Sequence, residues 1–128
     1  MKIKARFYFE AAHRLPNHPG KCARLHGHGY KVDITVEGPV DPITGMVMDF
    51  SDLKQIVNGS AIDLLDHYTL NDKMLFTPTA ENVARWIGNN LHLAFRCAYL
   101  NKSILPVEVV VWETEDCCAI WEAPNDET

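Results

Sequence analysis

Hydrophobic and polar residues alternate in two stretches near the beginning of the chain. Over residues 2–13 every second side chain is apolar until the run reaches His13, and a second run with the same period covers residues 26–36. A period of two is typical of a strand that buries one face. Residues 14–25 lie between the two runs and contain two prolines and a glycine, which indicates a loop.

The middle of the chain shows the longer period of amphipathic helices. Apolar residues recur at helical spacing over residues 53–65, preceded by Asp49 or Ser51 as the candidate N-cap. A second apolar stripe covers residues 83–95 and follows Thr79, whose side chain suits the N-cap position. We therefore expect two helices, each with one buried face.

Two β-rich stretches follow, over residues 107–113 and 118–123. The resulting order is strand, strand, helix, helix, strand, strand. Strands in blocks with helices grouped between them predict an α+β fold, in which two helices cover one face of a four-stranded antiparallel sheet. The length of 128 residues suits a single domain, residues 1–128, with one hydrophobic core.

The composition argues against several classes of partner. The formal net charge is −5 and no basic stripe is visible, so we expect no nucleic-acid partner. No apolar run approaches the ~20 residues of a membrane span, and the alternating N-terminus differs from a signal peptide. The four cysteines include the adjacent Cys117 and Cys118, a poor disulfide pair, so we expect a cytoplasmic protein with reduced thiols.

Two histidines at the start of the second predicted strand carry the main chemical signal. His26 and His28 are two residues apart, so their side chains point to the same side of a strand. His13 ends the preceding strand and would lie nearby in a hairpin. Three histidines with an open fourth position form one kind of catalytic zinc site. The spacing alone also fits a polar strand start that binds no metal.

Other polar residues have more than one interpretation. Cys22 is flanked by cations, and from the residues alone it is a fourth zinc ligand, a nucleophile or base, or an inert thiol. Asp66 and His67 resemble a carboxylate that orients an imidazole, or simply the polar end of a helix. Glu113 continues an apolar strand face, so it either binds something or marks where the strand reaches solvent.

Six motifs occur in order along the chain. They are FEAAH at residues 9–13, CxxxHGH at 22–28, DPxxGxVxDF at 41–50, LDHxxLN at 65–71, PTAEN at 78–82 and ET at 113–114. Together they resemble the 6-pyruvoyltetrahydropterin synthase family over residues 5–122. Three residues separate Cys22 from His26, and this short spacing resembles the branch of the family that makes a queuosine precursor.

The resemblance implies the tunnelling fold of that family and its assembly. Sheets of three subunits close into a barrel, and two trimers stack into a homohexamer with active sites between subunits. Closing the barrel would remove the exposed edges of a lone four-stranded sheet. The implied partners are a pterin triphosphate substrate and further copies of the chain.

The resemblance also implies a metal and a base. A zinc ion held by His13, His26 and His28 would coordinate the substrate side chain and stabilise a developing oxyanion as a Lewis acid. Cys22 stands at the position of the family cysteine and would take a proton from that side chain. This role makes Cys22 a base and not a fourth ligand.

The remaining matched residues would move protons and hold the pterin. Asp66 and His67 match the Asp-His pair of the family, with His67 relaying protons to the substrate. Glu113 matches the glutamate that anchors the pterin, whose amino group and ring N–H suit a carboxylate acceptor. Thr79 and Glu81 would help to shape that pocket.

The implied substrate is 7,8-dihydroneopterin triphosphate. In the queuosine branch the products are 6-carboxy-5,6,7,8-tetrahydropterin, acetaldehyde and triphosphate. Alternatives are 6-pyruvoyltetrahydropterin synthase activity, which keeps all three side-chain carbons, and a non-catalytic module that binds zinc or pterin. Our own candidates for binding the triphosphate are Arg14, Lys21 and Arg24.

Overall fold

A computed structural model describes residues 1–100 and 103–125. Its first two strands, β1 (Lys2–His13) and β2 (His26–Glu37), pair antiparallel along their whole length. The pairing runs from Lys2 opposite Glu37 to His13 opposite His26. A short 3₁₀ helix, Lys21–Ala23, lies in the loop between the two strands. The two strands and the loop predicted from the alternation are confirmed.

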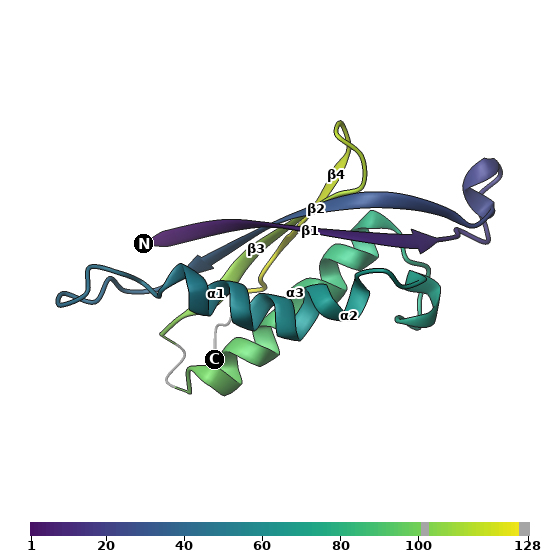
Figure 1. The fold of residues 1–128 in the computed structure, drawn as a ribbon. Coiled ribbons are helices and arrows are strands. Elements are labelled where there is room, and N and C mark those ends of the chain that lie inside the picture. Colours follow the sequence, from purple (N-terminus) through teal and green to yellow (C-terminus); the bar gives the residue numbers. More distant parts are fainter. Residues whose placement is uncertain (101–102, 126–128) are drawn as a thin grey trace.

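The other two strands complete one antiparallel sheet. β3 (Leu105–Trp112) pairs with β2, and β4 (Cys118–Glu122) pairs with β3, so the strand order is β1-β2-β3-β4. All helices longer than one turn lie on one side of this sheet (Figure 1). The predicted α+β fold, with helices on one face of a four-stranded antiparallel sheet, is therefore confirmed.

The first predicted helix is built from three consecutive pieces. α1 (Phe50–Val57) runs into a π-helical turn (Asn58–Ile62) and then into α2 (Asp63–Leu65). Asp49 is the N-cap, and its carboxylate accepts a hydrogen bond from the backbone N–H of Ser51. π-turns inside helices often lie near functional sites, and this one precedes the segment that begins at Asp66. Among the described residues, no helix has both the length and the apolar character needed to cross a membrane.

The second helix packs against the last two strands. α3 (Ala80–Ala98) begins at Thr79, whose side-chain oxygen accepts a hydrogen bond from the backbone N–H of Asn82, as predicted for an N-cap. A 3₁₀ helix, Leu70–Asp72, lies between α2 and α3. The buried side of α3 carries the predicted stripe: Val83, Ala84, Ile87, Leu91 and Phe95.

One parity of each strand faces the helices and forms the core. Phe9 and Tyr30 lie on neighbouring strands and stack with ring centroids 4.8 Å apart. His13 continues this buried face at the end of β1 and is fully buried. The histidines therefore lie where the hydrophobic layer between sheet and helices ends.

A glycine in α3 allows the helix to approach β4 closely. A Cβ placed on Gly88 would lie 2.3–2.6 Å from ring atoms of Trp121, whereas a Cβ on Gly59 in the π-turn meets nothing within 4 Å. The Trp121 indole is rigid and packs against the core, so it cannot give way cheaply. Gly88 thus sets the distance between α3 and β4.

We expect Gly88→Ala to destabilise the protein by about 1–3 kcal/mol through overpacking, although alanine favours helices. Gly59→Ala is the matched control and should stabilise the protein by about 0.5–1 kcal/mol, because the added methyl group meets no neighbour. Urea denaturation followed by circular dichroism measures both free energies of unfolding. A Gly88→Ala protein at least as stable as the Gly59→Ala protein would contradict the expectation.

Candidate metal centre and active site

The register of the first hairpin brings three histidines together. His13 ends β1 directly opposite His26, and His28 follows two residues later on the same face of β2. The ring centroids lie 4.6–5.0 Å apart in each of the three pairs. One ligating atom from each histidine lies within 4.8 Å of the other two. The three residues can therefore hold one metal ion.

Backbone carbonyls fix which ring nitrogen faces this centre. Nδ1 of His13 lies 2.8 Å from the carbonyl oxygen of Pro78, and Nδ1 of His26 lies 2.7 Å from that of Arg24. A carbonyl oxygen only accepts hydrogen bonds, so each Nδ1 carries the proton and donates it. Each Nε2 is left with its lone pair, which is the form that binds a metal.

The ring nitrogens of these histidines lie close to one another, as the ligands of one metal ion do. Nε2 of His13 and Nε2 of His26 lie 3.0 Å apart with lone pairs facing each other, an arrangement that a cation between them would stabilise. Nε2 of His28 is buried and has no hydrogen-bond partner among the described residues. At metal–nitrogen distances of about 2.0–2.1 Å, tetrahedral geometry places ligand nitrogens about 3.3 Å apart, close to the 3.0 Å between Nε2 of His13 and Nε2 of His26. These residues fit a tetrahedral metal such as zinc.

Burial keeps His28 in its neutral form. Its pKa lies below the usual value, mainly because burial disfavours the charged ring, and positive charge on His13 or His26 acts in the same direction. Glu113 opposes this shift through its negative charge. The carboxylate oxygen Oε1 of Glu113 lies 3.3 Å from Nε2 of His13 and 3.8 Å from Nε2 of His28. Glu113 therefore directly borders the metal centre and is not simply a strand end in solvent.

Cys22 lies outside the cluster of candidate ligands. It is half-buried in the 3₁₀ helix of the loop, and its carbonyl oxygen accepts a hydrogen bond from the backbone N–H of Leu15 at 2.9 Å. Among residues 1–100 and 103–125, the histidines alone make up the group of three or more ligating atoms within 4.8 Å of one another.

Asp66 and His67 form a carboxylate–imidazole pair. Asp66 caps the end of α2, and its Oδ1 accepts from Nδ1 of His67 and from the backbone N–H of Glu10, both at 2.9 Å. These contacts, the Glu10 N–H foremost, hold the pKa of Asp66 below its usual range. Adjacent residues seldom face each other on a helix. The pair forms because His67 has left the helix and adopts φ 65°, an uncommon value for a residue with a side chain.

Three of the other predicted residues line two hollows beside the histidines. His67 and His28 line one hollow of about 450 Å³. Glu113 and Glu81 line another, of about 470 Å³, together with Arg85. Thr79 uses its hydroxyl to cap α3. The structure thus brings the predicted metal ligands together and places His67 and Glu113 in hollows beside them.

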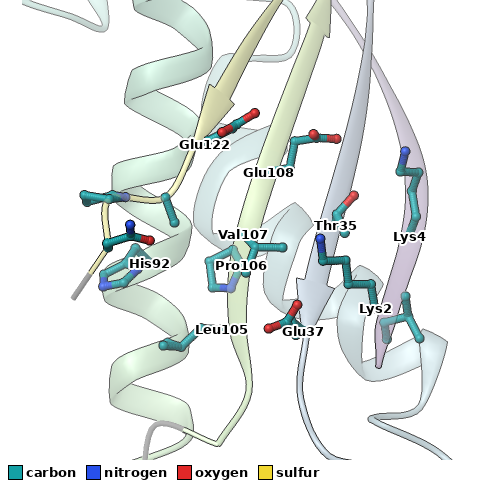
Figure 2. A pocket seen from close by; sticks show the side chains of 14 residues that line it. Lys2, Lys4, Thr35, Glu37, His92, Leu105, Pro106, Val107, Glu108 and Glu122 are labelled. Carbon is teal, nitrogen blue, oxygen red and sulfur yellow. The ribbon is translucent and has the colours of Figure 1, made fainter. Parts of the chain in front are cut away.

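A larger hollow lies at the other end of the sheet. It has a volume of about 790 Å³, and Figure 2 shows Lys2, Lys4, Glu108 and Glu122 among the side chains around it. It is lined by residues from the start of β1, the end of β2, the start of β3, the end of β4 and α3, whereas the histidines lie at the opposite ends of β1 and β2. None of the predicted site residues lines this hollow.

Several groups around the metal centre are not evident from the sequence. The carbonyl groups of Pro78 and Arg24 act through the backbone, which carries no residue-type signal. The hydroxyl of Tyr30 lies 3.3 Å from Nδ1 of His13, and burial raises the pKa of this tyrosine. Tyr30 shares the parity of His26 and His28, so the strand pattern contained the signal that could have identified it.

An α+β domain with a three-histidine cluster that could hold a metal ion and a carboxylate–imidazole pair is an arrangement typical of enzymes. The family profile described as 6-pyruvoyl tetrahydropterin synthase matches residues 2–124. The chain belongs to this family, which confirms the resemblance read from the six motifs.

Known proteins from both branches of the family are similar to this chain. A 6-carboxy-5,6,7,8-tetrahydropterin synthase from Synechocystis is 48% identical over 97 residues, which cover 72% of this chain and 75% of the relative. The human 6-pyruvoyl tetrahydrobiopterin synthase is 33% identical over 141 residues, covering 94% and 90% of the two chains. The solved structure of the Caenorhabditis elegans 6-pyruvoyl tetrahydropterin synthase matches with a TM-score of 0.81, at 27% identity and with 97% and 96% coverage.

Proposed function

We propose that the protein is a zinc-dependent carbon–carbon lyase that converts 7,8-dihydroneopterin triphosphate and water into 6-carboxy-5,6,7,8-tetrahydropterin, acetaldehyde and triphosphate. The observation that carries the proposal is the convergence of ring nitrogens from His13, His26 and His28, with both His13 and His26 held in the metal-binding tautomer by backbone carbonyls. A zinc ion there would supply Lewis acidity to the oxygen atoms of the substrate side chain.

Glu113 is the proposed anchor for the pterin. Its carboxylate borders the histidines and also lines the hollow of about 470 Å³, so a ring bound there would present its side chain to the metal centre. A carboxylate accepts hydrogen bonds from the amino group and ring N–H of a pterin. Glu81 would shape the same hollow, and Thr79 would act by fixing the first turn of α3.

Cys22 and His67 are the proposed proton carriers. Cys22, in its thiolate form, would take a proton from the substrate side chain. His67 would deliver and remove protons, and Asp66 would hold its ring so that Nδ1 keeps its proton and Nε2 remains free to act. Arg14, Lys21 and Arg24 stay our candidates for the triphosphate.

The spacing in the Cys22 loop favours carbon–carbon cleavage over the pyruvoyl reaction. Three residues separate Cys22 from His26, as in the queuosine branch. The relative from Synechocystis, at 48% identity, carries the 6-carboxy name, and the less similar human relative carries the pyruvoyl name. Queuosine precursor synthesis is therefore the proposed pathway, and 6-pyruvoyltetrahydropterin synthesis is the alternative.

We also propose that the chain, as one catalytic domain of residues 1–128, works in the cytoplasm as a homohexamer of two stacked trimers. β1 and β4 are the two edges of the sheet, and joining them between subunits would close the barrel. Each active site would then lie between subunits.

Product analysis tests the reaction directly. Purified protein loaded with zinc is incubated with 7,8-dihydroneopterin triphosphate, and we expect acetaldehyde and 6-carboxytetrahydropterin in equal amounts. Acetaldehyde is trapped as a hydrazone and the pterin is separated by chromatography. Triphosphate release with a pyruvoyl product and no acetaldehyde would replace the proposal with its alternative, and an unchanged substrate would favour the non-catalytic module.

A further inference from the structure

The side-chain amide of Asn71 makes hydrogen bonds to both the N–H and the carbonyl group of the Arg14 backbone. Oδ1 of Asn71 accepts a hydrogen bond from the backbone N–H of Arg14 at 2.9 Å, and Nδ2 of Asn71 donates to the carbonyl oxygen of Arg14 at 3.0 Å. Arg14 follows the last residue of β1, where pairing with β2 has ended at His13. The side-chain amide therefore takes the place of a neighbouring strand at this point.

Arg14 is also where the loop that carries Cys22 begins. The next residue, Leu15, donates its backbone N–H to the carbonyl oxygen of Cys22 at 2.9 Å. The path from Asn71 to Cys22 thus consists of the Arg14 backbone, one peptide bond and one further hydrogen bond. A change at Asn71 would therefore alter the position of the Cys22 backbone through this short chain of connections.

Asn71 belongs to the same short segment as His67. Residues 66–71 follow the outer edge of β1: the His67 N–H donates to the carbonyl oxygen of Glu10 at 2.6 Å, and the Ala12 N–H donates to that of Tyr68 at 3.1 Å. At the start of this segment, the Asp66 carboxylate accepts from the Glu10 N–H. The segment is fixed to β1 at residues 10 and 12 and to Arg14 just beyond the strand, and Asn71 makes the last of these attachments.

We infer that Asn71 is a positioning residue that sets the Cys22 loop and the His67 segment at a fixed separation across the end of β1. The inference rests on the proposed function, because it assigns Asn71 to the placement of the two proposed proton carriers. Asn71 itself donates to and accepts from backbone only, so it need not touch the substrate.

The chemistry of the amide explains why this position suits asparagine. Arg14 offers one donor and one acceptor, and a primary amide complements both. Aspartate would keep the acceptor for the Arg14 N–H but would place a second oxygen against the Arg14 carbonyl group. Alanine would remove both hydrogen bonds. Asn71→Asp therefore removes one of the two hydrogen bonds to Arg14, and Asn71→Ala removes both.

The test compares Asn71→Ala and Asn71→Asp with Asn90→Ala, which removes another amide-to-backbone contact, from Nδ2 to the Ser60 carbonyl oxygen within the helical layer. We expect kcat to fall by on the order of 10- to 100-fold in Asn71→Ala with KM changed less than about twofold, since small misplacements of reacting groups are costly. Asn71→Asp should lie between this variant and the unaltered protein, and Asn90→Ala should keep full activity.

A second readout needs no substrate and therefore separates this inference from the proposed reaction. The rate of Cys22 alkylation by iodoacetamide is measured by peptide mass spectrometry relative to the exposed Cys97 in α3. The ratio should change at least about threefold in Asn71→Ala, in Asn71→Asp by less, and not in Asn90→Ala. An unchanged ratio in folded Asn71→Asp would overturn the inference, whether or not acetaldehyde is formed.

The combination of Asn71→Ala with Cys22→Ala identifies the route of the effect. If Asn71 acts by placing Cys22, its substitution should lower the residual rate of Cys22→Ala by less than about twofold, because coupled residues are not additive. A full further loss of 10-fold or more would show that Asn71 does not act through Cys22, and would contradict the inferred connection.

Discussion

Replacing His28 with alanine should remove the metal and the activity together. His28 belongs to the cluster of three histidines, and its Nε2 is buried without a hydrogen-bond partner among the described residues. Two imidazoles alone leave a zinc ion with too few protein ligands for a stable catalytic site. The loss of Lewis-acid stabilisation, several kcal/mol, corresponds to a fall in turnover of roughly 10³-fold or more.

The measurement is the zinc content per chain after dialysis, by inductively coupled plasma mass spectrometry, with turnover measured on the same samples. His92→Ala is the control, since His92 lies in α3 beside the hollow at the other end of the sheet. We expect about one zinc ion per chain in the control and nearly none in His28→Ala. Near-stoichiometric zinc in His28→Ala would mean that the metal binds elsewhere.

Replacing Cys22 with alanine should abolish most turnover while leaving the metal in place. Removal of a general base costs typically 10²–10⁴-fold in rate. Cys22 lies outside the group of mutually close ligating atoms, so zinc binding by the histidines should persist. We therefore expect zinc to be lost in His28→Ala and retained in Cys22→Ala, whereas turnover should fall in both variants.

The control for Cys22 is Cys97→Ala, a thiol exposed on α3. Acetaldehyde release and zinc content are measured for both variants. Turnover in Cys22→Ala close to that of the control would show that Cys22 is not the base. Loss of zinc from Cys22→Ala, as in His28→Ala, would instead make the thiol a fourth ligand.

The sheet and the positions of the histidines could be predicted because both follow from a period of two. The alternation that buries Phe9 and Tyr30 also carries His13 and His28 onto the same face, and the hairpin register then brings them together. The N-cap of α3 at Thr79 could likewise be predicted from the sequence, because an N-cap depends only on one side chain and the helix that follows it.

Other features depend on contacts that the local pattern does not contain. The spacing of apolar residues between α1 and α2 suits an uninterrupted α-helix equally well. The periodicity therefore did not predict the π-turn. From the residues alone, Asp66 and His67 could equally be a helix end, because the pair requires a positive φ at His67. The attachment of Asn71 to Arg14 spans 57 residues and uses the backbone of its partner, so spacing gives no sign of it.

The segment over residues 66–71 has a consequence for how strands of other molecules can be added. It occupies the outer edge of β1 from residue 10 to the end of the strand, so among the described residues the edge groups of β1 that remain open belong to residues 2–8. β4, the opposite edge, has five residues, a length that residues 2–8 can accommodate. A neighbouring β4 could therefore dock only along the first half of β1, offset along the strand axis from the histidines. Successive sheets in a ring would be offset along the strand direction, with the histidine end of each β1 covered by its own chain.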